Sequence, residues 1–97
     1  MLVLQECIRK LSTFKQMFGD QFGIVKLGIF GSVARQDNNE DSDIDIVVEI
    51  EKPSLALMYE LKSRLIALLN CKVDLVRFRS SLRPFFKSNI LNDVIYV

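Results

Sequence analysis

The chain has 97 residues, of which 13 are basic and 12 acidic, and its formal net charge is +1. A chain of this length supports one modest hydrophobic core, so we expect a single domain spanning residues 1–97. Proteins that follow a long phosphate backbone carry a marked basic excess, so extensive nucleic-acid binding by this chain alone is not expected. No apolar run approaches the ~20 residues needed to span a bilayer, so we expect a cytoplasmic protein with no membrane partner.

The sequence contains no histidine and two cysteines, Cys7 and Cys71. The lack of histidine excludes zinc-finger sites, Ser-His-Asp triads and a histidine general base. The cysteines are far apart and form no C-x-x-C pair, so we expect buried free thiols rather than a disulfide or a metal pair. If the chain is an enzyme, carboxylates and a bound metal must carry out the proton transfer.

The first half of the chain predicts a helix, a strand and a polar loop. Apolar residues near the N-terminus recur at spacings of three and four, which predicts an amphipathic helix ending near Gly19. Residues 24–30 are apolar and β-branched and predict a strand, with Gly31 and Ser32 directly after it. Residues 36–42 are polar and turn-prone and predict a loop.

The second half begins with a segment, 43–50, in which apolar and polar residues alternate. This pattern predicts a strand with one apolar face and with Asp43 and Asp45 on the other. Pro53 and Ser54 mark the start of a helix with an apolar stripe. We expect that helix to end at Asn70.

The last quarter of the chain predicts two more strands and a short helix. Residues 72–78 predict a strand with Asp74 on the face opposite its apolar residues. Pro84 lies in the first turn of a short helix, and residues 93–97 predict an edge strand. The order α-β-β-α-β-α indicates an α+β fold in which a small mixed sheet of three to four strands is backed by helices.

Asp43 and Asp45 are the first candidate chemical group. Alternation along a strand places both carboxylates on one face, about 6–7 Å apart along the backbone. Such a pair repels itself unless a cation joins it, and carboxylate oxygens favour Mg²⁺ or Mn²⁺, which bind substrate phosphates as well. A lone Asp-x-Asp at a strand start is otherwise a solvated turn.

Gly31 and Ser32 are the second candidate group, for binding phosphate. Glycine lets the backbone approach closely, serine offers a hydroxyl and an N–H, and a short helix starting here would favour an anion. A nucleoside triphosphate would then bridge this turn and the metal.

Asp74 is the expected third carboxylate. A β-α-β connection places its strand beside that of Asp45, where it could ligate a second metal or accept a proton from an attacking hydroxyl. The alternative interpretation of Asp74 is an outward-facing strand residue without a chemical role.

A calcium-binding loop is another candidate, because Asp37, Asn39 and Asp41 match its first three ligand positions. It fails because Ser42 replaces the required glycine and Val48 replaces the bidentate glutamate.

The sequence resembles the minimal nucleotidyltransferase (MNT) antitoxins of the DNA polymerase β-like nucleotidyltransferase superfamily. Gly31-Ser32 is followed by ten residues and then by Asp43-Ile44-Asp45, which is the family's signature spacing. The segments "GSVAR" and "SDIDIVV" extend the match, and the order of elements fits nearly the whole chain. The family often has glycine where this chain has Gln36.

This resemblance implies a set of roles and partners. Gly31 and Ser32 would hold the triphosphate of ATP, and Asp43, Asp45 and Asp74 would be the catalytic carboxylates and metal ligands of a site with two Mg²⁺ ions. In the family, such proteins pair with a HEPN-domain toxin and transfer AMP from ATP to a toxin tyrosine. The chain would then be a protein adenylyltransferase that silences its partner.

Several alternatives stay open at this stage. The chain could neutralise a toxin by binding alone, or transfer a nucleotide to a small molecule such as an aminoglycoside. It could form a homo-oligomer or a hetero-oligomer with the toxin. Three arginines of the C-terminal third could contact phosphate or an acidic patch on a partner. They could also form a solvated face with no binding role: Arg77, Arg79 and Arg83.

Overall fold

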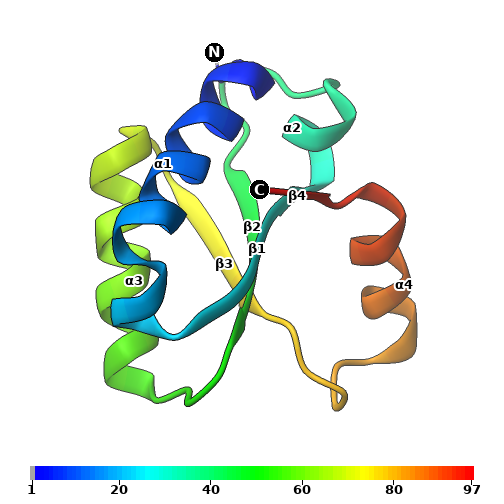
Figure 1. The fold of residues 1–97 in the computed structure, drawn as a ribbon. Coiled ribbons are helices and arrows are strands. Elements are labelled where there is room, and N and C mark those ends of the chain that lie inside the picture. The colour runs from blue at the N-terminus through cyan, green and yellow to red at the C-terminus, as the bar shows by residue number, and fades with distance from the viewer. Residues whose placement is uncertain (1) are drawn as a thin grey trace.

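The computed structural model describes residues 2–97 as a four-stranded sheet with helices on both faces (Figure 1). α1 and α3 cover one face, α4 covers part of the other, and α2 lies at one end of the sheet. The elements are α1 (Leu4–Phe22), β1 (Ile24–Phe30), α2 (Gly31–Arg35), β2 (Ile44–Ile50), α3 (Leu55–Leu69), β3 (Val73–Arg77), α4 (Pro84–Asp93) and β4 (Ile95–Tyr96).

The strand order in the sheet is β3-β2-β1-β4. β1 is antiparallel to both of its neighbours, whereas β2 and β3 are parallel and are joined through α3. This mixed sheet confirms the predicted α+β class, and β4 confirms the predicted edge strand. The crossover through α3 also confirms that the Asp74 strand lies beside the Asp45 strand.

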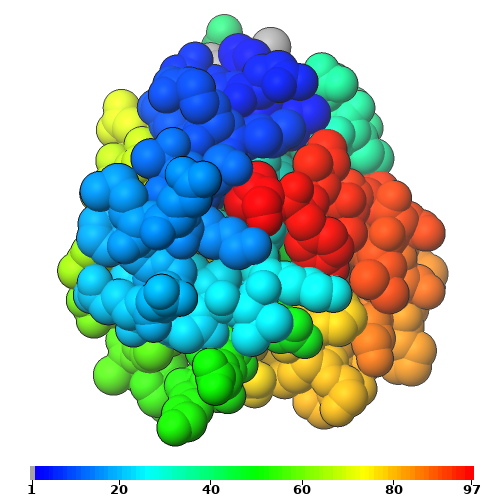
Figure 2. Space-filling model, viewed as in Figure 1, coloured from blue at the N-terminus to red at the C-terminus, as the bar shows by residue number. Residues whose placement is uncertain are grey.

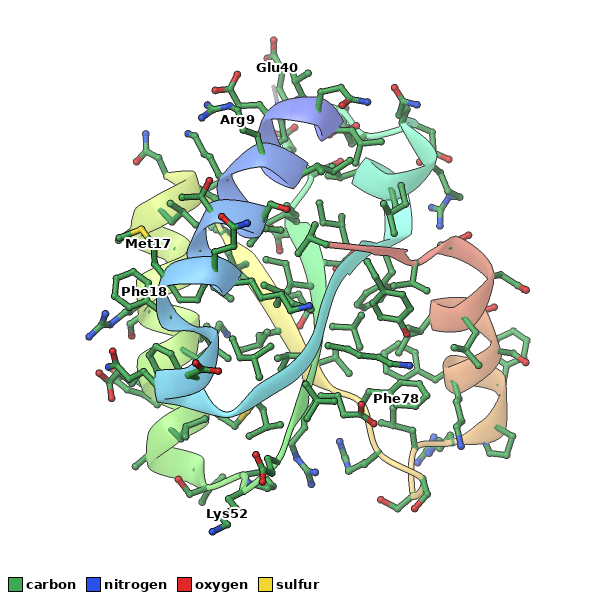
Figure 3. The ribbon with its side chains drawn as sticks, in the orientation of Figure 1. Arg9, Met17, Phe18, Glu40, Lys52 and Phe78 are labelled. Carbon is green, nitrogen blue, oxygen red and sulfur yellow. The ribbon has the colours of Figure 1, made fainter. Side chains whose placement is uncertain are left out.

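The two faces of the sheet carry separate hydrophobic cores. The larger core lies under α1 and α3 and takes Ile44, Ile46, Val48 and Ile50 from β2, as the alternating pattern predicts. The smaller core lies under α4 and contains Phe30, Val47 and Ile90, with Phe78 packed against it (Figure 3). Asp45 shares the α4 face with Val47, because side chains alternate along a strand.

The helix boundaries follow local backbone chemistry. α1 continues to Phe22, so the prediction that it ends near Gly19 is wrong; a Cβ at Gly19 would meet only an ordinary contact at 3.6 Å. The helix stops at Gly23, which takes a left-handed φ of 67°. Ser54 caps α3 by accepting the Leu57 N–H at 3.1 Å, Asn70 ends that helix and Pro84 is the first residue of α4.

Both cysteines are free, as predicted, but only Cys7 is buried. Cys71 is half-buried because it lies in the short turn between α3 and β3. Burial raises the pKa of both thiols, and the neighbouring Cys71 adds to the effect on Cys7. The pair therefore belongs to the packing between α1 and α3 rather than to a reactive site.

The C-terminal segment is held against α1, and several charged side chains extend into solvent. The Lys15 ammonium donates to the Val97 carbonyl at 3.0 Å, and the C-terminal segment packs between α1 and α4 (Figure 2). The charged side chains of Arg9, Glu40 and Lys52 point away from the body of the molecule (Figure 3). Within residues 2–97, no helix combines the length and apolar character that crossing a membrane requires.

Candidate active site

Asp45 lies where three strands come together at one end of the sheet. In the parallel pairing of β2 with β3 it stands opposite Asp74, and in the antiparallel pairing of β2 with β1 it stands opposite Phe30. The start of β2, the start of β3 and the end of β1 therefore coincide. The Gly-Ser turn directly after β1 is brought to the acidic start of β2.

Gly31 is packed directly against Asp45. Its φ is 73°, a left-handed conformation that side chains rarely adopt. A Cβ at this position would overlap the Asp45 carboxylate and lie 3.0 Å from its Cγ. Glycine is thus required both by the turn and by the close approach of the backbone to the Asp45 carboxylate.

A pocket of about 560 Å³ opens at this point, within the usual size range for small-molecule sites. β1, α2 and β2 form one wall, with Gly31, Ser32 and Asp45 among its residues. α4 forms the opposite wall. The residues contributed by α4 are Phe86, Asn89, Asn92 and Asp93.

Asp43 and Asp74 flank this pocket rather than line it. Both are exposed, whereas Asp45 is half-buried. Burial, followed by the negative charges of Asp74 and then Asp43, raises the pKa of Asp45 from 3.8 to about 6. The two carboxylates are therefore near enough to oppose the ionisation of Asp45.

The donor set fits a divalent cation that is shared with a ligand. Among residues 2–97, no three acidic, cysteine or histidine side chains converge into a preformed metal cage. Mg²⁺ characteristically needs only one or two carboxylates together with substrate phosphates. Asp45, crowded by two other acids and facing an open pocket, offers such a partial site, and a cation there would relieve the repulsion that raises its pKa.

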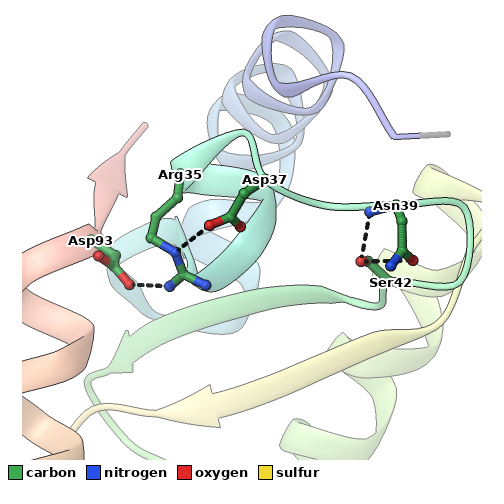
Figure 4. Close-up of polar contacts among 5 residues, drawn as sticks. All are labelled: Arg35, Asp37, Asn39, Ser42 and Asp93. Atoms are coloured by element: carbon green, nitrogen blue, oxygen red, sulfur yellow. Dashed lines mark hydrogen bonds and ion pairs between the residues drawn. The ribbon is translucent and has the colours of Figure 1, made fainter.

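Arg35 lines the pocket and bonds both to the loop after α2 and to the end of α4 (Figure 4). Its guanidinium donates to Asp37 at 3.1 Å and to Asp93 at 2.7 Å, and the two bonds raise the pKa of Arg35 above its ordinary value. In the following loop, the Ser42 hydroxyl accepts the Asn39 N–H at 3.0 Å. Asp37 is thus paired with Arg35, which is close to it in sequence.

Comparison with protein families matches residues 10–97 to the nucleotidyltransferase domain family. The chain belongs to this nucleotidyltransferase family. It is 42% identical over 98 residues to the protein adenylyltransferase MntA of Thermococcus cleftensis, a match covering 100% of this chain and 98% of MntA. The expectation of an enzyme of the nucleotidyltransferase class is confirmed.

Solved structures support the same assignment. A structure assigned to the minimal nucleotidyltransferases superimposes with a TM-score of 0.81 at 30% identity, covering 97% of this chain and 95% of that one. One solved complex contains a triply AMPylated HEPN toxin of Shewanella oneidensis and an MNT antitoxin. A chain of this complex matches with a TM-score of 0.65 at 21% identity. That match covers 94% of this chain and 70% of the other, and at this identity it supports the fold alone. The resemblance to the minimal nucleotidyltransferases is confirmed.

In this nucleotidyltransferase, Gln36 occupies the C-terminal end of α2. The residue takes a left-handed φ of 62° and caps α2, so glutamine adopts the conformation for which glycine is favoured. A side chain in that conformation carries backbone strain, which glycine would avoid.

The C-terminal wall of the site could not be predicted from motifs. Phe86, Asn89 and Asn92 belong to no recognisable pattern, and only the packing of α4 brings them to the Gly-Ser turn. Arg35 lies within "GSVAR", so its presence at the site had a signal in the sequence. The three arginines after β3 lie outside the pocket lining: Arg77, Arg79 and Arg83.

Proposed function

We propose that this nucleotidyltransferase is an antitoxin that transfers AMP from ATP to a hydroxyl, that of a tyrosine, on a HEPN-family toxin. The observation that carries the proposal is the meeting of Gly31 and Asp45 in one pocket, with Asp74 in register beside Asp45. Similarity to the MntA adenylyltransferase over the full chain supports the reaction type. The fold shared with an MNT antitoxin that is bound to an AMPylated HEPN toxin supports the class of partner.

Each site residue has a role in this proposal. Gly31 and Ser32 hold the triphosphate through backbone N–H groups and the serine hydroxyl. Asp43 and Asp45 hold Mg²⁺, with Mn²⁺ as a substitute, and Asp74 completes a set for two ions. When bound, the metal neutralises the negative charge that develops on the reacting phosphate oxygens.

The transfer is a displacement at the α-phosphorus. The toxin hydroxyl oxygen forms a bond to that phosphorus while the bond to the β-phosphate oxygen breaks, and pyrophosphate leaves with the electron pair. The hydroxyl proton passes to a carboxylate at the site, and we assign this role to Asp74; its exposure and its position beside Asp45 support the assignment.

The test is to incubate the protein with ATP, Mg²⁺ and the toxin encoded by its neighbouring gene, and to measure the mass of the toxin. We expect the mass to rise by one or more adenylyl groups, and both Asp43→Asn and Asp45→Asn to abolish the increase. Asp41→Asn, an exposed acid of the preceding loop, is the matched control and should retain activity. No mass increase, together with toxin neutralisation by the double variant of Asp43 and Asp45, would show an antitoxin that acts by binding alone.

A further inference from the structure

The α4 wall of the pocket has no role in the transfer chemistry, yet it faces the phosphate-binding turn across the same cavity. Phe86, Asn89 and Asn92 recur at intervals of three, which places them along one side of the helix. Their neighbour Ile90 is fully buried in the smaller core and anchors the helix to the sheet. The three side chains are therefore presented from a fixed support.

The wall combines one aromatic ring with two amides. Phe86 contacts Phe30 nearly edge to face, with ring centroids 6.3 Å apart, and it remains 37% exposed where it lines the pocket. Within residues 2–97, neither the Asn89 nor the Asn92 side chain makes a hydrogen bond to another protein group, although other amides of the chain do. An aromatic face beside unused amide donors and acceptors is the chemistry that binds a nucleobase.

We propose that Phe86, Asn89 and Asn92 form the nucleobase subsite and that they select adenine. The inference rests on the proposed function, because it assigns the base of the nucleotide whose triphosphate lies at Gly31 and Ser32. Phe86 packs against the plane of the base. The two amides pair with its edge.

The choice of adenine follows from hydrogen-bond polarity. Adenine presents a donor, its N6 amino group, next to an acceptor, N7, and an asparagine amide matches this pair with its oxygen and its nitrogen. Guanine presents two adjacent acceptors, O6 and N7, which suit arginine or lysine. Among the lining residues that the structure describes, Arg35 is the one cation, and Asp37 and Asp93 already engage its guanidinium.

The size and layout of the cavity suit this arrangement. A volume of about 560 Å³ exceeds what phosphates alone need and falls within the range of pockets that hold drug-sized ligands. With the triphosphate at the Gly-Ser turn, the base extends toward α4. The flanking side with Asp43 and Asp74 is left for the acceptor.

The test measures binding instead of transfer, by titration calorimetry of the full chain with Mg²⁺ and three probes: ATP, GTP and inorganic tripolyphosphate. The wild-type protein should bind ATP more tightly than GTP. Asn89→Ala and Asn92→Ala should each weaken ATP binding about tenfold, the lower part of the range for an amide-to-adenine pair because the wall is exposed. Phe86→Leu, which keeps an apolar contact with Phe30, should weaken ATP and GTP alike.

Tripolyphosphate, which lacks a base, separates base recognition from damage to the phosphate site. Its affinity should stay within about twofold of wild type in all three variants. Phe85→Leu and Ser88→Ala are matched controls on α4, because both residues are exposed and neither lines the pocket. They should leave the affinities for all three probes unchanged.

Unchanged ATP affinity in the double variant of Asn89 and Asn92 would overturn the inference, and so would a parallel loss of ATP and tripolyphosphate binding. Weaker ATP binding by the Asn89 and Asn92 variants without loss of the preference over GTP would also contradict selection of adenine. AMP transfer to the toxin tests the proposed function separately. A protein that transfers AMP but passes none of these binding tests would retain its proposed function and lose this subsite.

Discussion

The Arg35 guanidinium on α2 lies 2.7 Å from the Asp93 carboxylate at the end of α4 (Figure 4). This ion pair joins residues 58 positions apart in sequence and connects the two walls of the pocket. The second partner of Arg35, Asp37, is only two residues away, at 3.1 Å, and its side chain is 57% exposed against 21% for Asp93. Of the two bonds, the one to Asp93 therefore connects distant parts of the chain, whereas the one to Asp37 is local.

Asp93→Asn should therefore lower the stability of the protein more than Asp37→Asn does. Both effects should be small, because exposed ion pairs contribute little and are screened by salt. The measurement is the urea midpoint of unfolding at low salt and at about 1 M salt, where the Debye length is only about 3 Å. A larger loss for Asp37→Asn, or a difference that persists at high salt, would contradict the assignment.

Gly31→Ala should destabilise the protein and remove ATP binding. The left-handed backbone alone costs a residue with a Cβ about 1–2 kcal/mol. The new methyl group must also displace the Asp45 carboxylate, which adds to the loss. Chemical denaturation and calorimetric titration with ATP and Mg²⁺ measure the two effects.

The matched control for that substitution is Gly19→Ala. Gly19 lies inside α1 with space for a methyl group, so alanine should stabilise the helix by about 0.5–1 kcal/mol. ATP affinity should be unchanged. Equal behaviour of the two alanine variants would refute the steric role of Gly31.

The metal-free protein should lose stability as the pH rises from about 4 to about 6. Burial, then the charges of Asp74 and Asp43, raise the pKa of Asp45 from 3.8 to about 6, so the folded state binds this proton more tightly than the unfolded state. The stabilising contribution is complete below the unfolded pKa of 3.8 and is lost as the pH passes the folded pKa of about 6. The free energy of unfolding, measured by urea denaturation across this window, should fall.

Asp45→Asn should flatten that profile in the same pH window, and Asp41→Asn should leave it unchanged. Added Mg²⁺ should also flatten the profile of the wild-type protein, since a cation at the site favours the ionised carboxylates. The assignment fails if the slope between pH 4 and 6 survives in the Asp45 variant, the window being set by the pKa of that residue.

Gln36→Gly should stabilise the protein by roughly 0.5–1 kcal/mol, because the left-handed φ of 62° no longer strains a side chain. Asn70→Gly, at the left-handed cap of α3, should give a smaller gain because asparagine tolerates this conformation better than glutamine. Thermal denaturation of the two variants provides the comparison. A loss of stability on Gln36→Gly would mean that the glutamine side chain makes a favourable contact of its own.

Much of the fold was predictable because the alternation of apolar residues is strong and the boundary residues are unambiguous. The strand at 24–30 ends where its apolar run meets Gly31, and Ser54 and Pro84 begin their helices as their chemistry indicates. The end of α1 was missed because glycine is common after helices. Gly19 is tolerated inside the helix, and the left-handed stop occurs at Gly23.

The candidate site was predictable on its N-terminal side and not on its C-terminal side. Gly31, Ser32, Asp43 and Asp45 lie within 15 residues of one another, at a spacing that local backbone geometry converts into proximity. Asp74 required the further inference of a parallel crossover, which the fold confirms. The α4 wall depends on how Ile90 packs against the sheet, and no local pattern encodes that contact.

The strict alternation along β2 also determines where the chain can change in length. A residue inserted between Ile44 and Ile46 would shift every following side chain to the opposite face, so that apolar residues would enter the pocket and Glu49 the larger core. A residue inserted in the preceding surface loop, at 38–41, would only lengthen a turn. The count of residues from Asp43 to the end of β2 must therefore stay unbroken for Asp45 to face the pocket.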